Sequence, residues 1–181
     1  MQKINNSEVI IIETPKYIDN RGFFYESYNK HKFDKLINSQ INFIQDNISF
    51  STFGVLRGLH FQADPYEQSK LLRVIDGEIL DVVVDLRKES DQFGQYISHR
   101  IDAQSSKQLF VPRGFAHGFI ALSEIAIVSY KIDNIYDPKS ERTLSWDDKD
   151  LNIDWKLPKS KIILSEKDSN GISFRDIKRM L

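Results

Sequence analysis

Hydrophobic and polar residues alternate over many short segments of the chain, which predicts β-strands rather than long helices. These segments are bounded by Gly, Pro, Asn and Asp, which favour turns. The predicted strands span 9–12, 23–28, 43–49, 55–62, 68–75, 78–86, 95–101, 108–111, 116–122 and 125–133. About ten short strands with closely spaced turns favour a double-sheet barrel over a parallel α/β fold.

One segment has helical spacing instead. Asn29 is a favourable N-cap for a helix that would continue to about Asn38. Its apolar residues recur at the interval that places them on one side of a helix: Phe33, Leu36 and Ile37. After Tyr136 the chain is mostly polar, and we expect 137–181 to wrap the barrel with short helices and loops.

In the strand predicted at 78–86, Asp81, Val83 and Asp85 lie on one face, and Leu80, Val82, Val84 and Leu86 lie on the other. Asp81 and Asp85 share the first face because side chains alternate along a strand. Since buried carboxylates need polar surroundings, this face is expected to line a polar cavity. The preceding Asp76-Gly77 pair predicts a hairpin to the strand before it, as a type I′ turn requires positive φ at both central residues.

Two histidines lie at comparable places in predicted strands. In the stretch Arg57–Gln62, strict alternation puts Arg57 and His60 on opposite faces, so both serve one site only if Arg57 lies on the rim of a wide cavity. His117 follows the turn at 112–114 and, like His60, has a glycine nearby. This similarity indicates a shared site, although either histidine could instead be a hydrogen-bonded structural residue.

A metal site is the obvious alternative for two histidines in a small β-barrel. The positions where further ligands would be expected carry Gln62, Gln68 and Lys70. An amide oxygen is a poor ligand for a transition metal, and an ammonium group beside a divalent cation is unfavourable. Lys70 is better suited to stabilise an oxyanion that develops during a reaction. The residues therefore favour chemistry without a metal.

Composition narrows the possible classes of protein. A chain of 181 residues with 40% hydrophobic content can form one domain with a core, and we expect a single domain over 1–181. The net charge of -1 gives no general attraction to nucleic acid. The absence of cysteine excludes disulfides, thiolate metal ligands and a cysteine nucleophile. The chain shows neither a signal peptide nor an apolar run of about 18 residues, so a cytoplasmic location without membrane contact is expected.

Several motifs follow one another in an order typical of one family. They are Asp19-x-Arg21-Gly22-x-Phe24, Gln45-Asp46-Asn47-x-Ser49, Arg57-Gly58-Leu59-His60-Phe61-Gln62, Gln68-x-Lys70-Leu71, Gly77-x-x-x-Asp81-Val82-Val83-Val84-Asp85-Leu86-Arg87, Pro112-x-Gly114-Phe115-Ala116-His117-Gly118-Phe119 and Leu164-Ser165-x-Lys167-Asp168. In this order the chain resembles the dTDP-4-dehydrorhamnose 3,5-epimerases, the RmlC-type sugar-nucleotide epimerases of the cupin superfamily. The resemblance extends from about Val9 to Asp168.

The resemblance implies an all-β fold, a cupin-type double-stranded β-helix (jelly-roll barrel) with a few short peripheral helices. It implies an isomerase that inverts carbons 3 and 5 of dTDP-4-dehydro-6-deoxy-D-glucose to give dTDP-4-dehydro-L-rhamnose. No cofactor or metal would be needed for this step of dTDP-L-rhamnose biosynthesis, which supplies carbohydrates such as lipopolysaccharide O-antigen. The family is typically a homodimer with exchanged N-terminal strands.

Other functions share features with this one. Related epimerases invert only one carbon or act on another nucleotide-linked 4-keto sugar with the same fold and base. A metal-dependent cupin enzyme and a non-catalytic sugar or nucleotide binder are the more distant alternatives. The joint presence of His60, Lys70 and Tyr130 counts against a mere binder.

Inversion next to a carbonyl needs a base, an acid on the opposite face and a group that stabilises the enolate. By resemblance the catalytic residues are the base His60, the acid Tyr130, the enolate-stabilising Lys70 and Asp168, which would hold the imidazole of His60. His117 would assist Lys70. From strand phase we infer that Asp81 orients His117.

The resemblance also implies contacts to the nucleotide. For the diphosphate, whose oxygens cationic side chains bind well, they are Arg21, Arg57 and Lys167. For the edges of thymine and ribose they are Glu26, Gln45 and Asn47. Tyr136 would stack on thymine, and Glu141 would make a further nucleotide contact.

Overall fold

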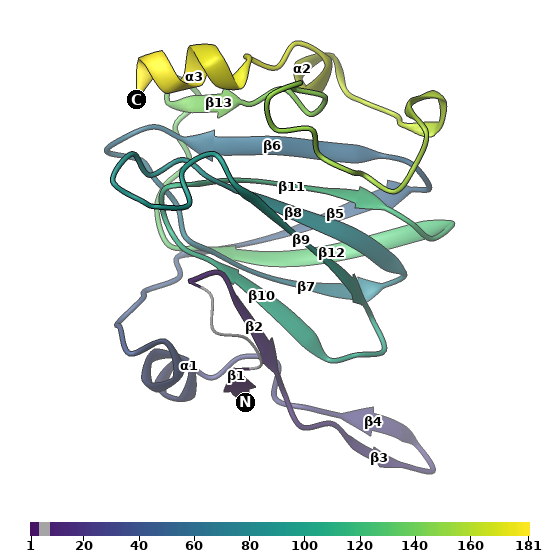
Figure 1. Ribbon diagram of the computed structural model, residues 1–181. Helices are drawn as coiled ribbons and strands as arrows, with labels where there is room; N and C mark the ends of the chain where they lie inside the picture. Colours follow the sequence, from purple (N-terminus) through teal and green to yellow (C-terminus); the bar gives the residue numbers. More distant parts are fainter. Residues whose placement is uncertain (4–7) are drawn as a thin grey trace.

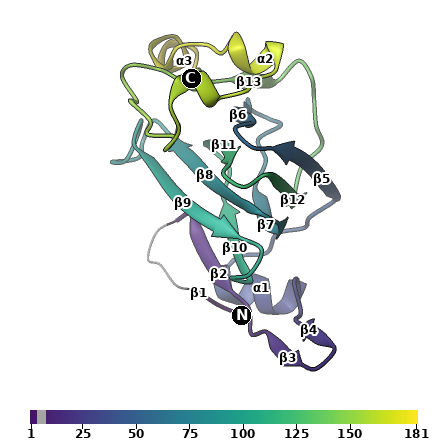
Figure 2. The ribbon, with the colours of Figure 1, turned by 90° about the vertical axis from the view of Figure 1, so that its right-hand side faces the viewer.

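The computed structural model describes residues 1–3 and 8–181. Two antiparallel β-sheets face each other to form a barrel, and the short helices lie outside it (Figures 1 and 2). This arrangement confirms the prediction of an all-β jelly-roll barrel with a few peripheral helices. In the described part of the chain, no helix is long and apolar enough to cross a membrane.

The two sheets are built from strands that are distant in sequence. The six-stranded sheet has the order β1 (Gln2–Lys3), β2 (Ile10–Glu13), β10 (Lys107–Val111), β7 (Lys70–Asp76), β12 (Ile125–Ile132) and β5 (Gln45–Thr52). The five-stranded sheet has the order β13 (Glu141–Thr143), β6 (Leu56–Gln62), β11 (Phe115–Ala121), β8 (Glu78–Asp85) and β9 (Tyr96–Asp102). A separate hairpin consists of β3 (Tyr17–Asp19) and β4 (Gly22–Phe24).

The core lies between the sheets and follows the predicted alternation of β8. Val83 packs inside the barrel with residues such as Leu72 and Val128. Leu80 and Val82, on the other face of β8, belong to a second apolar cluster. This phase directs the side chain of Asp81 into the barrel, as expected from the sequence.

The second cluster lies between the five-stranded sheet and the C-terminal segment. That segment contributes Leu144, Trp155 and Ile177 to the cluster. Its helical elements are η1 (Lys159–Lys161), α2 (Glu166–Ser169) and α3 (Phe174–Met180). Because the segment packs against the outer face of β6, α2 is held beside that strand.

The helix predicted after Asn29 is confirmed as α1 (Lys30–Ile37). The Asn29 side chain accepts a hydrogen bond from the Lys32 backbone N–H, and Asn38 ends the helix in the left-handed conformation. Phe33 is fully buried in a third apolar cluster against the six-stranded sheet.

The predicted hairpin at Asp76-Gly77 is wrong. β7 and β8 belong to different sheets, so this turn carries the chain from one sheet to the other. Gly77 has φ +77, whereas Asp76 is not among the residues with positive φ, so the type I′ geometry is absent. A turn-forming pair specifies a reversal of the chain locally, but only the barrel core decides which strands pair.

Two strand ends differ from prediction by three residues or more. The strand expected at 23–28 ends at Phe24, because the β3–β4 hairpin projects from the barrel and, among the described residues, forms a sheet of its own. β5 continues to Thr52 through the segment expected to be a linker, since it pairs with β12 over its whole length.

Candidate active site

His60 and His117 lie side by side on neighbouring strands. They are paired in register across β6 and β11. The two strands approach closely at Gly58 and Gly118, since a Cβ atom at Gly58 would lie 2.6 Å from the Gly118 Cα. Both histidines line one space of about 310 Å³, which we call the histidine cavity; its lining also includes Ser49, Arg57, Lys70, Leu72, Phe119, Val128, Tyr130, Glu141, Ser165, Lys167 and Asp168. The prediction that the two histidines share one site is therefore confirmed in the sense that both line the same cavity.

The prediction that Arg57 and His60 lie on opposite faces of their strand is wrong, because both line the histidine cavity. The pairing between β6 and β11 shifts register between His117 and Phe119. Such an irregularity interrupts the alternation of side chains. Leu56 and Leu59 consequently share the same outer cluster although they are three residues apart.

Asp168 on α2 holds the imidazole of His60. The distance from His60 Nε2 to Asp168 Oδ1 is 2.6 Å, and the side chains are 25% and 5% exposed, respectively. Since a carboxylate only accepts, Nε2 donates this hydrogen bond and Nδ1 is the basic nitrogen. Ser165, the N-cap of α2, donates from Oγ to Asp168 Oδ2 at 2.7 Å and so fixes the carboxylate.

Burial and charge give this pair the protonation states that a base requires. Burial lowers the pKa of His60 more than the Asp168 carboxylate raises it, and the positive charges of Lys167 and Lys70 lower it further. Burial alone would raise the pKa of Asp168, but hydrogen bonds from His60 and Ser165 bring it below its usual value. At neutral pH the site therefore holds a neutral imidazole beside a carboxylate.

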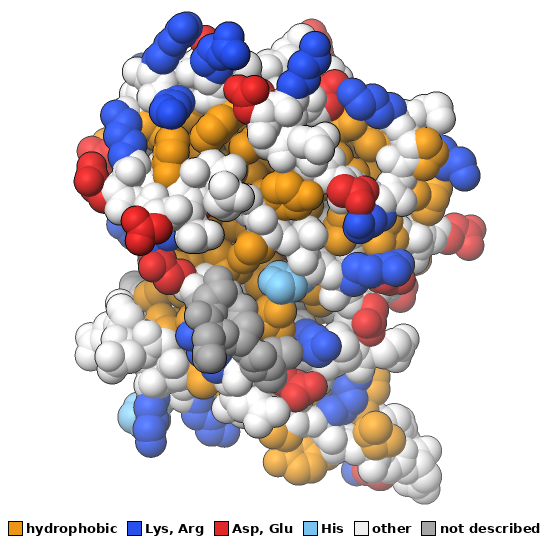
Figure 3. Space-filling view, in the orientation of Figure 1, with side chains coloured by type: hydrophobic (Ala, Val, Ile, Leu, Met, Phe, Trp, Pro, Cys, Tyr) orange, Lys and Arg blue, Asp and Glu red, His pale blue; other side chains and the backbone are white. Residues whose placement is uncertain are grey.

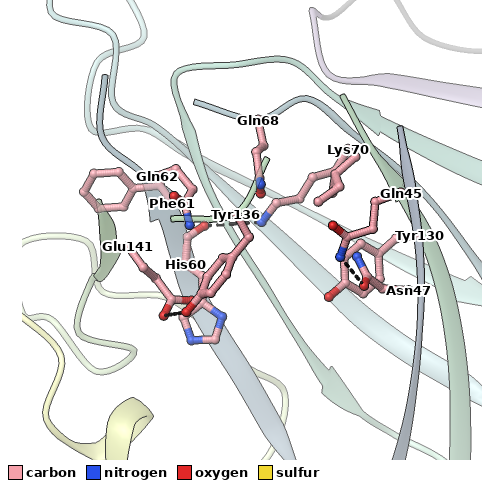
Figure 4. A pocket seen from close by; sticks show the side chains of 11 residues that line it. Gln45, Asn47, His60, Phe61, Gln62, Gln68, Lys70, Tyr130, Tyr136 and Glu141 are labelled. Carbon is pink, nitrogen blue, oxygen red and sulfur yellow. Dashed lines mark hydrogen bonds between the residues drawn. The ribbon is translucent and has the colours of Figure 1, made fainter. Parts of the chain in front are cut away.

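Lys70 on β7 places its amine in the middle of the site. Its Nζ lies 3.5 Å from the backbone oxygen of His60. In Figure 4, His60 and Tyr130 lie on opposite sides of the pocket and the Lys70 amine lies between them. Burial lowers the pKa of Lys70 to about 8, while the charges of Asp81 and Glu141 limit the shift. The group is therefore still mostly an ammonium ion at pH 7.

Tyr130 reaches the cavity from the opposite sheet. It lies on β12, where Leu72 of β7 and Asn47 of β5 flank it in register. Burial raises the pKa of Tyr130, although the charge of Arg57 opposes this effect. The phenol thus remains protonated at neutral pH and can donate a proton.

His117 is held by Asp81 in a second pair. The distance from His117 Nε2 to Asp81 Oδ2 is 2.8 Å, and the Asp81 side chain is completely buried. The contact inferred from strand phase is therefore present. Within the described residues, Asp81 Oδ1 is buried without a hydrogen-bond partner. As Nε2 donates to Asp81, only Nδ1 of His117 is left to face a bound molecule.

A second space of about 230 Å³ adjoins the histidine cavity and shares His60, Lys70, Tyr130 and Glu141 with it. We call it the amide cavity after Gln45, Asn47, Gln62 and Gln68; Phe61, Ile132 and Tyr136 complete its lining (Figure 4). Between the two spaces, Glu141 accepts a hydrogen bond from Tyr136 Oη at 3.0 Å and pairs with Lys167 Nζ at 2.7 Å. Together the cavities offer room for a polar molecule larger than one sugar ring.

Comparison with known proteins decides the family. A family profile described as dTDP-4-dehydrorhamnose 3,5-epimerase matches residues 3–176. The epimerase of Shigella flexneri is 46% identical over 93% of this chain and 92% of its own length. The crystal structure of the Elizabethkingia anophelis epimerase superposes with a TM-score of 0.92, at 47% identity and 97% coverage of both chains. The Legionella pneumophila epimerase, solved in complex with dTDP-4-keto-L-rhamnose, gives a TM-score of 0.90 at 40% identity and covers 97% of this chain and 92% of that one.

The chain belongs to the dTDP-4-dehydrorhamnose 3,5-epimerase family. It has the cupin fold of that family. It is an isomerase that catalyses the 3,5-epimerisation in dTDP-rhamnose synthesis.

The epimerase does not bring two of its predicted nucleotide contacts to its own cavities. Arg21 pairs with Asp19 in the β3–β4 hairpin. Glu26 pairs with Lys32 near α1. Both views show the hairpin projecting at the end of the molecule opposite α2 (Figures 1 and 2). Within one chain, Arg21 and Glu26 therefore lie away from the other predicted site residues, and their contacts to the nucleotide stay a prediction.

Sequence reasoning gave no role to some residues that line the histidine cavity of this epimerase. Leu72, Phe119 and Val128 supply apolar walls, and Ser49 supplies a hydroxyl. Ser49 could have been found from strand phase, since it lies two residues beyond Asn47 on β5. The apolar residues carry no chemical signal in the sequence and become visible only with the fold.

Proposed function

We propose that this epimerase removes the proton at carbon 3 or carbon 5 with His60 and returns a proton from the opposite face with Tyr130. The observation that carries the proposal is the placement of these two groups across one pocket, with the Lys70 amine between them (Figure 4). In each half of the reaction a C–H bond breaks, its electrons form an enolate with the 4-keto group, and a new C–H bond forms on the other face. No electrons are exchanged with another molecule.

His60 fits the role of the base because its lowered pKa keeps Nδ1 free of a proton at neutral pH. Asp168 is a positioning residue that fixes the tautomer and stabilises the imidazolium formed after proton abstraction. Tyr130 fits the acid because burial raises its pKa. Before the next inversion, the imidazolium of His60 releases its proton to solvent and the phenolate of Tyr130 recovers one from solvent.

Lys70 and His117 would stabilise the enolate oxygen at carbon 4. The Lys70 ammonium is partly buried, where a fixed charge acts on a developing oxyanion more strongly than in water. His117 can help only when Nδ1 carries a proton, because Nε2 is engaged by Asp81. Asp81 would thus position His117.

The diphosphate and the thymine ring would occupy the side of the site where Arg57 and Lys167 adjoin the amide cavity. Arg57 and Lys167 line the histidine cavity and offer positive charge to phosphate oxygens. Gln45, Asn47 and Tyr136 line the amide cavity, which offers amide groups and an aromatic ring for ribose and thymine. Lys167 would exchange Glu141 for the diphosphate on binding.

We also propose that the enzyme is a homodimer in which the β3–β4 hairpin of one copy lies against the other copy. The hairpin exposes Tyr17, Ile18, Phe23 and Phe24, and hydrophobic side chains are visible at this end of the molecule in Figure 3. The edge strand β5 exposes a further apolar group, Ile48 and Phe50. Pairing these two surfaces would bury apolar area and satisfy the open edge of the sheet.

In that dimer, Arg21 and Glu26 would approach the nucleotide end of the other copy's site, because β5 carries Gln45 and Asn47. The molar mass in solution tests the dimer.

A cytoplasmic location remains the expectation from sequence, and cell fractionation tests it.

Proton NMR of dTDP-4-dehydro-6-deoxy-D-glucose with the enzyme in D₂O tests the proposed chemistry. The wild type should replace the hydrogens at carbons 3 and 5 by deuterium and invert both centres. His60→Ala should abolish exchange at both positions while dTDP binding is largely retained. Exchange that survives in this variant would exclude His60 as the base, and exchange at one carbon only would indicate a single-carbon epimerase.

A further inference from the structure

Ser49 presents a buried hydroxyl group without a hydrogen-bond partner among the described residues. It lies on β5, where it is in register with Val128 of the barrel core, so its side chain faces inward. It lines the histidine cavity together with His60 and Tyr130. A buried hydroxyl without a partner is unfavourable, and in native proteins such a group calls for an explanation.

A neighbouring serine on the same strand has a hydrogen-bond partner, so a position on this face of β5 does not by itself leave a hydroxyl group unpaired. Ser51 lies two residues further on the same face of β5, and its Oγ accepts a hydrogen bond from Arg57 Nε at 3.0 Å. The same guanidinium donates to the Phe50 backbone oxygen at 2.8 Å. Arg57 therefore satisfies Ser51 and leaves Ser49 open toward the cavity.

The surroundings of Ser49 limit what can satisfy its hydroxyl. Of the other residues that the six-stranded sheet contributes to the cavity, Leu72 and Val128 are apolar, and Tyr130 is the acid of the chemistry proposed above. The cationic Lys70 and the imidazoles of His60 and His117 serve the keto oxygen and the protons in the chemistry proposed above. What remains for Ser49 is a neutral hydroxyl of the bound sugar.

We propose that Ser49 hydrogen-bonds the hydroxyl at carbon 2 of the sugar and is a specificity-determining residue of this epimerase. This inference rests on the proposed placement of the sugar between His60 and Tyr130. Carbons 3 and 5 are inverted, so a hydroxyl at carbon 3 changes its direction during the reaction. Carbon 2 keeps its configuration, so a contact to its hydroxyl can persist from substrate to product and hold the ring through both inversions.

Ser49→Ala is the test variant, and Ser129→Ala is its matched control. Ser129 lies on the adjacent strand β12 in register with Ile48, so it faces away from the cavity. Loss of one hydrogen bond to the substrate should lower kcat/KM of Ser49→Ala about three- to tenfold, and Ser129→Ala should match the wild type. The thermal midpoint of free Ser49→Ala should be equal to or above that of the wild type, because a buried unpaired hydroxyl is removed. A fall in the midpoint would indicate a structural role and overturn the inference.

The 2-deoxy analogue of the substrate separates the proposed contact from other effects. With this analogue the wild type and Ser49→Ala should show the same rate of hydrogen exchange at carbon 5, because the partner of Ser49 is missing. The assignment to carbon 2 is wrong if the exchange rates of the wild type and Ser49→Ala still differ with the 2-deoxy analogue. It is also wrong if the two rates become equal only with a 3-deoxy analogue. Absence of exchange in the wild type on the natural substrate would instead contradict the proposed function itself.

Discussion

At the scale of single residues, the site depends on three neighbouring side chains whose pKa values differ, so that each has a different protonation state at neutral pH. His60 is neutral, Lys70 is charged and Tyr130 is protonated at neutral pH, as burial and neighbouring charges require. These three states are the ones in which a base, an electrostatic stabiliser and an acid begin an inversion. The conditions under which all three coexist should define the active range of pH.

We expect a bell-shaped dependence of kcat/KM on pH. The rate should rise with pH as His60 loses its proton, with an apparent pKa below the usual 6.5. It should fall as Lys70 loses its proton near pH 8.

In Lys70→Met, the rate should drop by a factor on the order of 10²–10³, and the alkaline limb near pH 8 should disappear. An alkaline limb that persists unchanged in this variant would assign it to another group.

Asp168→Asn should lower kcat on the order of 10²–10⁴-fold with little loss of stability, because the charge that supports the imidazolium is removed while the side chain keeps its shape. The chain offers a matched control in α3. Ser173 and Asp176 make the same two contacts as Ser165 and Asp168, but no histidine among the described residues pairs with Asp176. Asp176→Asn should leave kcat unchanged and affect only stability. Similar kcat values for the two variants would argue against the positioning role of Asp168.

At the scale of elements, the sequence predicts local features better than their relations in space. The phase of β8 correctly placed Asp81 inside the barrel, and the cap at Asn29 correctly located α1. Both depend on spacing within a few residues. The alternation of β6 failed because β6 has one more residue than β11 between the pairs His60–His117 and Arg57–Phe119, and the contact between His60 and Asp168 joins residues 108 positions apart. Family resemblance indicated this pair, whereas spacing could not.

The close approach of β6 and β11 is the feature that holds the two histidines together. A Cβ atom at Gly118 would lie 2.7 Å from the Arg57 backbone oxygen and 3.1 Å from the Gly58 Cα. Gly118→Ala should therefore separate the strands, lower the free energy of unfolding by about 1–3 kcal/mol and reduce kcat more than tenfold through misplacement of His60. Chemical denaturation and steady-state kinetics measure both effects. Wild-type kinetics with wild-type stability would show that the close approach is not required.

At the scale of the whole molecule, a single chain does not complete the predicted set of nucleotide contacts. The hairpin that carries Arg21 lies at the end of the molecule opposite α2, where Asp168 is located (Figures 1 and 2). The exposed aromatic residues of this hairpin are unusual for a surface that faces only solvent. The exchange of hairpins between two copies proposed above would account for both observations.

Mixing two inactive variants tests this exchange. If Arg21 serves the site of the other copy, a dimer of Arg21→Ala with His60→Ala contains one intact site, and random reassociation should restore about a quarter of the wild-type activity. A mixture of His60→Ala with Tyr130→Phe is the control for residues on the same chain, and it should restore nothing because both residues line one cavity. Failure of the first mixture to regain activity after verified subunit exchange would place Arg21 in its own chain's site or outside any site.

The opposition of His60 and Tyr130 across one sugar ring is tested most directly by comparing exchange with inversion in Tyr130→Phe. Proton NMR in D₂O follows both events on the same sample. Because abstraction by His60 does not need the phenol, deuterium should still enter carbons 3 and 5 while inversion falls much further than exchange. Equal losses of exchange and inversion would show that Tyr130 is not the acid on the far face.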